Sequence, residues 1–430
     1  MEKIQQEQAF SFNDDRQMNV IVMSQPQAHS ISILCSFRDG VAYESEQEWG
    51  ISHFLEHLNF NGTPQYPSLT AISSAIEGEG GQLSAYSTRD STSFWAKVPP
   101  WSYRAAFSVL ASIISNNDFK DEAVEQEKSI IVQEMERERA NARLHNGLSL
   151  EDLLLLPHPM GRSPLGDAAS IAKHDVSVIS QYKKRVYCSS NCSLVIAGAI
   201  DQDIARDCAL TLSCAMHEGE ARRKVQGKTG PGKDKRKIHH CEYPGLSQVN
   251  IAVGWLIQDP DACLRWLDWS LINTLTGVGF GSLLYRRLRE EHRLTYLVTT
   301  QLKLYEPSGT FRILLDTKPE HVKNSIEHIT DIFSGLARNG VRKDDFERAR
   351  GQFRGNMTVR TEDTMEYARI LGRRIFMGEP AESLAEICRR IDSLSPSIVE
   401  ELAGRHFTED EMVVSLAGSA EALEKTGLMS

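Results

Sequence analysis

Two segments of this 430-residue chain resemble each other and recur at a fixed interval. Ser193–Asp203 is SLVIAGAIDQD and Met412–Ala422 is MVVSLAGSAEA, and their glycines, Gly198 and Gly418, lie 220 positions apart. A chain of this length exceeds one ordinary hydrophobic core, so at least two domains are expected. The recurrence therefore predicts two similar halves that arose by internal duplication.

Each half begins with the alternating polar and apolar residues of a strand, over Asn19–Phe37 and Lys237–Leu256. Between them, His217–Lys237 is rich in Lys and Arg and almost free of apolar residues, as in a linker. We predict a first half at 1–216, a linker at 217–237 and a second half at 238–430. Both halves also carry long helical patterns, which predicts an α+β fold with helices packed on antiparallel or mixed sheets.

Composition narrows the functional classes. The net charge of −10 argues against a nucleic-acid-binding protein, whose surface would be basic. The longest apolar runs fall far below the ~20 residues of a membrane span, and the first twenty residues lack the apolar core of a secretory signal. The eight cysteines form no CxxC pair. We expect a cytoplasmic protein that binds neither nucleic acid nor membrane.

The segment from Ser45 to Gly62 predicts a helix with two distinct faces. Ser45 and Glu48 form a capping-box pattern, and Gly62 is a typical C-terminal stop. Ile51–Leu58, ISHFLEHL, places an apolar stripe on one face and His53, Glu56 and His57 on another, at i, i+3 and i+4.

Side chains at this spacing lie close enough for two imidazoles to bind one zinc ion. Glu56 would then reach the attacking water as a general base rather than the metal. A shuffled chain of this composition would contain His-x-x-acid-His only about 0.05 times.

A catalytic zinc ion needs a third protein ligand and one open position. The stretch 121–146 lacks Gly and Pro, which predicts one long helix that ends at Gly147. It carries Glu127, Glu134 and Glu138, of which Glu127 and Glu134 share a face. Spacing alone does not choose among these carboxylates.

The HFLEH motif with a distant glutamate resembles the pitrilysin/insulinase family of zinc peptidases, whose H-x-x-E-H motif inverts the commoner H-E-x-x-H. In that family 76 residues usually separate the second histidine from the ligand glutamate, and the same interval here leads from His57 to Glu134. The resemblance therefore implies a zinc ion, one per chain, held by His53, His57 and Glu134. It also gives Glu127 a supporting role that orients a ligand.

The resemblance extends over most of the chain. Gly80–Trp95 is similar to the edge strand that receives the substrate backbone in this family, which implies that Ser84, Ala85 and Tyr86 contact the peptide. Where that strand commonly carries Asn-Ala, this chain has Ser84-Ala85. In the second half, FGSLLYRRLREEHRLTY resembles a segment with an Arg and a Tyr seven positions apart, here Arg289 and Tyr296.

The family implies a mitochondrial-processing-peptidase-like fold of two similar α/β-sandwich halves, the second without metal ligands. It further implies an endopeptidase that cleaves extended peptides inside a dimeric chamber, where the second half of the partner supplies Arg289 and Tyr296. A homodimer is expected because this chain holds both sets of residues; a heterodimer with a related chain is the alternative. A non-catalytic peptide-binding or assembly subunit of the same fold is the competing function.

Overall fold

The computed structural model describes residues 8–221, 238–306, 308–376, 379 and 381–428. It divides into two compact units, each of which contains one sheet with helices on both faces. The first unit comprises the described residues of 1–134, 163–224 and 357–387, and the second comprises those of 135–162, 225–356 and 388–430. Among the described residues, no helix combines the length and apolarity needed to span a bilayer.

The sheet of the first unit has six strands in the order β1-β2-β6-β3-β5-β4. Its middle strands are rich in Ile, Val and Leu and are buried over almost their whole length, as expected for strands covered on both faces. Among the described strands, β4 pairs with β5 alone and forms one edge of the sheet. The strands are β1 (Gln8–Asn13), β2 (Asn19–Ser24), β3 (Ile31–Arg38), β4 (Gln82–Ser87), β5 (Ser91–Val98) and β6 (Cys192–Gly198).

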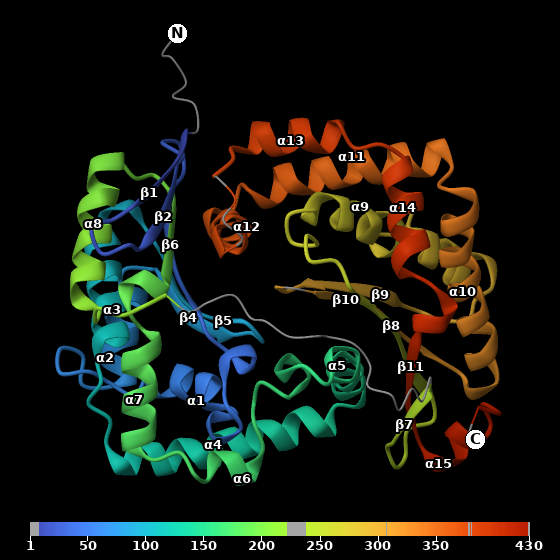
Figure 1. Ribbon diagram of the computed structural model, residues 1–430, viewed down its shortest axis with the longest axis horizontal. Coiled ribbons are helices and arrows are strands. Elements are labelled where there is room, and N and C mark those ends of the chain that lie inside the picture. The colour runs from blue at the N-terminus through green and yellow to red at the C-terminus, as the bar shows by residue number, and fades with distance from the viewer. Residues whose placement is uncertain (1–7, 222–237, 307, 377–378, 380, 429–430) are drawn as a thin grey trace. The chain divides into compact units, whose positions relative to one another are not determined.

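Helix α12 covers one face of this sheet, and α3 and α8 lie over the other (Figure 1). Under α12, side chains of the central strands such as Leu34 and Val195 form a core cluster with Met365, Tyr367 and Leu371. The helices of the first unit are α1 (Ile51–Leu58), α2 (Leu69–Glu77), α3 (Tyr103–Ser115), α6 (Ala168–Ile171), α7 (Val176–Val186), α8 (Gln202–Ala215) and α12 (Thr364–Phe376).

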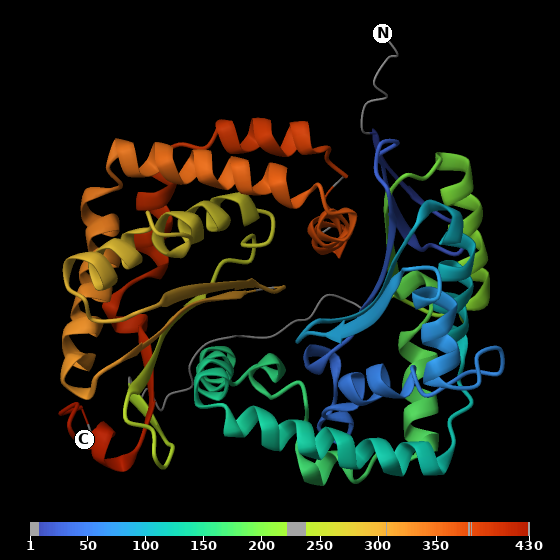
Figure 2. The same cartoon turned by 180° about the vertical axis from the view of Figure 1, so that it is seen from behind.

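The second unit repeats this plan on a five-stranded sheet in the order β7-β11-β8-β10-β9. Helix α5 covers one face, and α9, α10 and α14 lie over the other (Figure 2). Its strands are β7 (Ile238–Glu242), β8 (Val249–Ile257), β9 (Val298–Leu304), β10 (Gly309–Thr317) and β11 (Val413–Gly418). Its helices are α5 (Ala142–Leu155), α9 (Trp266–Gly277), the π-helix Tyr285–Glu291, α10 (Val322–Asn339), α14 (Ser397–His406) and α15 (Ala420–Glu424).

The two units exchange one helix each. Helix α5, from the first half of the sequence, packs on the sheet of the second unit, and α12, from the second half, packs on the sheet of the first. The division between units falls inside α4 (Asp121–Ala140), α11 (Lys343–Arg360) and α13 (Leu384–Asp392). The units are therefore interleaved along the chain.

The α+β class and the two similar halves predicted from the sequence are confirmed. The repeated segments form β6 and β11, which occupy corresponding places beside β3 and β8. The proposed boundaries at 216 and 238 stay a prediction, since residues 222–237 of the linker lie outside the described residues.

Candidate metal centre

Helix α1 carries the two motif histidines and is shorter than the sequence predicted. It runs over Ile51–Leu58, with Gly50 at its N-cap in the left-handed conformation (φ 87°), which suits glycine. The predicted capping box of Ser45 and Glu48 does form, but it caps the short 3₁₀ helix Glu46–Glu48 instead. The two faces of α1 are as expected, since Ile51, Phe54, Leu55 and Leu58 are buried.

Buried Glu44, which the sequence reasoning missed, holds the N-terminus of α1. Its carboxylate accepts hydrogen bonds from the backbone N–H groups of Gly50 at 2.8 Å and Ser52 at 3.0 Å. Burial raises the pKa of Glu44 to about 7, although these hydrogen bonds oppose that effect. The carboxylate satisfies N–H groups that have no partner within the helix.

A buried lysine holds the other end of α1. The ammonium group of Lys183, on α7, donates to the side-chain oxygen of Asn59 and to the carbonyl of Ile113 at 2.9 Å. Asn59 follows α1 and donates in turn to the carbonyl of Leu55 at 2.8 Å. Burial lowers the pKa of Lys183 well below its usual value. Because both ends are fixed, the histidine face of α1 has a defined orientation.

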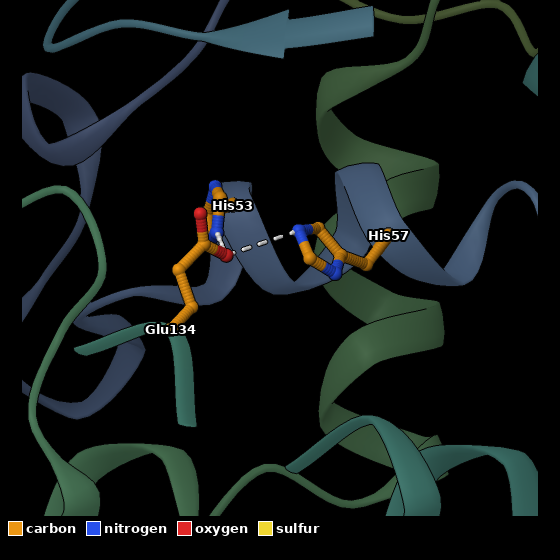
Figure 3. Close-up of side chains that lie close together, drawn as sticks. All are labelled: His53, His57 and Glu134. Atoms are coloured by element: carbon orange, nitrogen blue, oxygen red, sulfur yellow. Dashed lines mark hydrogen bonds and ion pairs between the residues drawn. The ribbon is translucent and has the colours of Figure 1, made fainter. Parts of the chain in front are cut away.

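The structure brings His53, His57 and Glu134 together at the face of α1 (Figure 3). Glu134 Oε2, on α4, lies 3.2 Å from His53 Nε2 and 3.6 Å from His57 Nε2. The two imidazole centroids are 4.6 Å apart, and the three candidate ligand atoms all lie within 4.8 Å of one another.

These distances fit a zinc ion. Tetrahedral zinc with bonds of about 2.1 Å places its ligand atoms about 3.4 Å apart, between the two measured Glu134–His distances. Two imidazoles and one carboxylate are also a donor set of catalytic zinc sites, in which the fourth position is left for water or substrate.

Each imidazole also contacts a second carboxylate through Nδ1, so its Nε2 is the atom that faces Glu134. His57 Nδ1 lies 2.7 Å from Glu127 Oε1, and His53 Nδ1 lies 3.7 Å from Glu56 Oε2. Carboxylates beside the remote nitrogen of metal-ligating histidines fix the tautomer and ring orientation. Glu127 thus lies beside His57, and its supporting role stays a prediction.

The pKa values of His53 and Glu127 reflect the close contacts between histidines and carboxylates in this cluster. Burial opposes protonation of His53, but hydrogen bonds to Glu134 and Glu56 outweigh it and raise its pKa to about 9. Burial likewise opposes ionisation of Glu127, but hydrogen bonds from His57 and Asn61 lower its pKa. The cluster thus favours positive charge between its carboxylates, which a divalent cation would also supply.

Glu127 and Glu134 come from the same face of α4, as the seven-residue spacing predicted. The predicted extent of this helix was wrong: α4 ends at Ala140, and Gly147 lies inside α5. Asn141 separates the two helices because its side chain accepts a hydrogen bond from the N–H of Leu144 at 3.1 Å. An asparagine N-cap can start a new helix without a Gly or Pro break.

Glu56 has a partner that the sequence did not indicate. Ser87 Oγ, at the end of β4, donates a hydrogen bond of 2.6 Å to Glu56 Oε2. The two residues are 31 positions apart, so the contact depends on how the β4–β5 hairpin packs against α1. No spacing pattern could have revealed it.

The proposed substrate-binding residues Ser84, Ala85 and Tyr86 lie on β4, at the edge of the sheet as predicted. Because side chains alternate along a strand, Ser84 and Tyr86 share the face opposite to Ser87. Tyr86 packs against the core cluster under α12. The backbone of β4, rather than the Ser84 side chain, is therefore the feature of this strand that a peptide could pair with.

Arg289 and Tyr296 contact each other in the second unit. The Arg289 guanidinium carbon lies 4.3 Å from the centroid of the Tyr296 ring, within cation–π range. Arg289 is on the π-helix Tyr285–Glu291, and π-helices are frequent at functional sites. Tyr296 is 79% exposed as a residue, so its hydroxyl is available to a ligand.

Two similar units, each a sheet covered by helices, and a His–His–Glu cluster with a further glutamate beside it are the features of the inverted-motif class of zinc-peptidase scaffolds. Family models agree: residues 19–154 match the model described as insulinase (peptidase family M16), and residues 175–353 match the M16 inactive domain. The chain belongs to the pitrilysin/insulinase (M16) family.

Relatives extend this likeness over nearly the whole chain. A Bacillus subtilis protein named as an uncharacterized zinc protease is 24% identical, over 94% of this chain and 96% of its own length. A probable mitochondrial-processing peptidase subunit beta of Arabidopsis thaliana is also 24% identical, over 89% of this chain and 73% of its own length. The solved structure of a peptidase M16 inactive domain from Pseudomonas fluorescens shares the fold, with a TM-score of 0.85, 21% identity and coverage of 96% and 98%.

Proposed function

We propose that this chain is a zinc-dependent endopeptidase that cleaves extended peptides. The observation that carries the proposal is the convergence of His53 Nε2, His57 Nε2 and Glu134 Oε2 at distances suited to one zinc ion per chain. Glu56 Oε2 lies 3.7 Å from His53 Nδ1, and Glu56 is not one of the three candidate ligands, so its carboxylate is placed for proton transfer beside the cluster.

The residues of the chain divide the chemistry among them. His53, His57 and Glu134 would hold the ion, which supplies Lewis acidity that polarises the scissile carbonyl and activates water near neutral pH. Glu56 accepts a proton from the attacking water and passes it to the leaving amine. Glu127 keeps His57 in the tautomer whose Nε2 faces the ligand cluster.

The substrate would be an extended peptide that adds a strand beside the edge strand β4. Such pairing uses backbone hydrogen bonds, so it selects unfolded or short peptides over folded proteins. Ser84, Ala85 and Tyr86 would contribute mainly their main-chain N–H and C=O groups.

We further propose that two copies form a dimer in which Arg289 and Tyr296 of one copy act at the metal centre of the other. The Tyr296 hydroxyl would stabilise the developing oxyanion, and Arg289 would hold the peptide backbone. A heterodimer with a related chain is the alternative assembly. A cytoplasmic location is in keeping with eight cysteines that form no disulfide.

The competing function is a non-catalytic peptide-binding or assembly subunit, since residues 175–353 match a model described as an inactive domain. Zinc analysis and a quenched fluorogenic peptide library separate the two. We expect about one zinc per chain and cleavage that Glu56→Gln lowers by about 10²–10⁴-fold with zinc retained. Glu77→Gln, at an exposed position on α2, is the matched control and should leave cleavage unchanged. A zinc-loaded wild-type protein that cleaves nothing in the library would favour the competing function.

A mixing experiment tests the dimer proposal. Glu56→Gln and Tyr296→Phe should each lower cleavage when present in both copies. Subunit exchange between equal amounts of the two variants makes about half of the dimers mixed, and one of the two sites in each mixed dimer has both residues intact, so cleavage should rise toward about a quarter of the wild-type value. No recovery, despite demonstrated exchange, would contradict a site shared between copies.

A further inference from the structure

Glu56 is held by a short hydrogen bond that comes from outside its own helix. Ser87 Oγ donates to Glu56 Oε2 at 2.6 Å, whereas His53 Nδ1 lies 3.7 Å from the same oxygen. A hydroxyl–carboxylate bond of this length is charge-assisted and among the stronger kinds in proteins. Neither contact involves Oε1 of Glu56. These contacts therefore restrain Oε2 of the Glu56 carboxylate, and Oε1 lies outside them.

Ser87 itself is well restrained. It is the last residue of β4 and pairs with Thr92 of β5, whose Oγ1 lies 3.3 Å from Ser87 Oγ. Strand β5 is largely buried and pairs with β3 on its other side. A donor on a paired strand next to a buried neighbour can hold a partner more closely than a donor on a loop.

The turn after Ser87 is braced as well. The N–H of Thr88 donates to the carbonyl of Ser91 at 2.7 Å, which closes the hairpin. Arg373, on the exchanged helix α12, donates two hydrogen bonds to the carboxylate of Asp90 in this turn, at 2.9 and 2.8 Å. The end of β4 is thus fixed from the sheet and from α12.

We propose that Ser87 is a positioning residue that orients Glu56 for proton transfer. By fixing Oε2, Ser87 keeps the carboxylate at the metal centre and leaves Oε1 to accept the proton from water. This proposal rests on the function proposed above, and it adds that the substrate-binding strand and the general base are joined by one hydrogen bond. A peptide bound along β4 would then lie against the same strand that orients the base.

The test compares Ser87→Ala with Ser87→Thr, which retains a hydroxyl at the same position. We expect Ser87→Ala to lower kcat by about 10- to 100-fold, because small misplacements of a catalytic group have effects of this size. Both KM and zinc content should stay as in the wild type, and Ser87→Thr should restore most of kcat. Ser93→Ala is the control, since it removes a buried hydroxyl contact with Ser36 on the same sheet without touching Glu56.

Crystal structures of the zinc-loaded wild type and Ser87→Ala give a readout that does not depend on activity. The proposal requires the Glu56 carboxylate to leave its wild-type position in Ser87→Ala and to return in Ser87→Thr. An unmoved Glu56, an unchanged kcat, a loss expressed in KM alone, or loss of zinc would each overturn it. If the wild type cleaves no peptide, the proposed function fails, while the position of Glu56 in these structures still decides the role of Ser87.

Discussion

Corresponding helices of the two units differ at the positions that bear the chemistry. At the 220-residue interval, His53, Glu56 and His57 on α1 correspond to Asn273, Thr276 and Gly277 on α9. A side chain at the last of these positions would force Thr300 to move, since a Cβ on Gly277 would lie 2.1 Å from the Thr300 side chain. The apolar residues of α9 are still buried, as those of α1 are.

Glu134, the proposed third ligand, shows the same contrast. Glu134 on α4 corresponds to Arg354 on α11, which pairs with Asp392 at 3.3 Å. Both units therefore keep their buried apolar residues, while the positions in the second unit that correspond to the proposed zinc ligands hold Asn273, Gly277 and Arg354, which offer neither an imidazole nor a carboxylate. Packing and chemistry lie on different faces of these helices, so one can change without the other.

The largest effect is expected when Glu134 of the first unit is replaced by arginine, which is the residue at the corresponding position of the second unit. We expect Glu134→Arg to abolish stoichiometric zinc binding and to reduce peptide cleavage to background, because it replaces an anionic ligand with a cation. Metal analysis after gel filtration and the fluorogenic assay measure the two effects. Glu136→Arg, an exposed site two residues along α4, should change neither. Zinc retained by Glu134→Arg would remove Glu134 from the ligand set.

The sequence predicted the part of the site that a single helix determines. The spacing of His53, Glu56 and His57 placed all three on one face, because helical periodicity is local. Glu134 needed the family interval, since several carboxylates share its helix. The contact between Ser87 and Glu56 was beyond prediction because it depends on tertiary packing.

The sequence also did not reveal that α5 packs on the sheet of the second unit and α12 on the sheet of the first. An amphipathic pattern indicates that a helix buries one face but does not specify the sheet on which it packs. Asn141, by contrast, was a readable signal, since asparagine is a preferred N-cap and the break between α4 and α5 occurs there.

The exchanged helices α5 and α12 make different polar contacts in the units they join. The next largest effect is expected when the contact of α5 is removed. On α5, Glu151 pairs with Arg312 of β10 at 3.0 Å, and the two side chains are only 4% and 2% exposed. Glu151→Ala would leave a buried guanidinium without its counter-charge, so we expect a loss of about 3–5 kcal/mol in the stability of the second unit. Hydrogen exchange of the β8 and β10 amides would report it.

The matched control for this prediction is Glu347→Ala on α11. Glu347 pairs with Arg350 at 2.6 Å, but its side chain is 48% exposed, so its loss should cost less than about 1 kcal/mol. Equal protection losses in both variants would show that burial of the Glu151 pair is not what holds α5.

A smaller effect is expected at Glu127, whose counterpart at the 220-residue interval is Glu347. The acid is present in both units, but the position that corresponds to His57 is Gly277, so Glu347 has no histidine at that position to orient. Glu127→Gln retains a hydrogen-bonding side chain but loses the charge, so we expect zinc affinity to fall by about 10- to 100-fold. Competition with a chromophoric chelator measures this. Complete loss of zinc would instead identify Glu127 as a ligand.

The smallest effect is expected where α12 meets the hairpin of the first unit. Arg373 donates two hydrogen bonds to Asp90, but its side chain is 34% exposed, so solvent weakens the ion pair. Arg373→Lys should therefore lower the free energy of unfolding by no more than about 1 kcal/mol. A lysine cannot reproduce the paired hydrogen bonds of arginine to one carboxylate, so the turn after Ser87 should become more mobile locally. Hydrogen exchange at Thr88 and Ser91 should therefore quicken while the amides of β3 keep their protection. If the whole first unit lost protection, the Arg373 contact would anchor α12 itself, and the two exchanged helices would be held equally firmly.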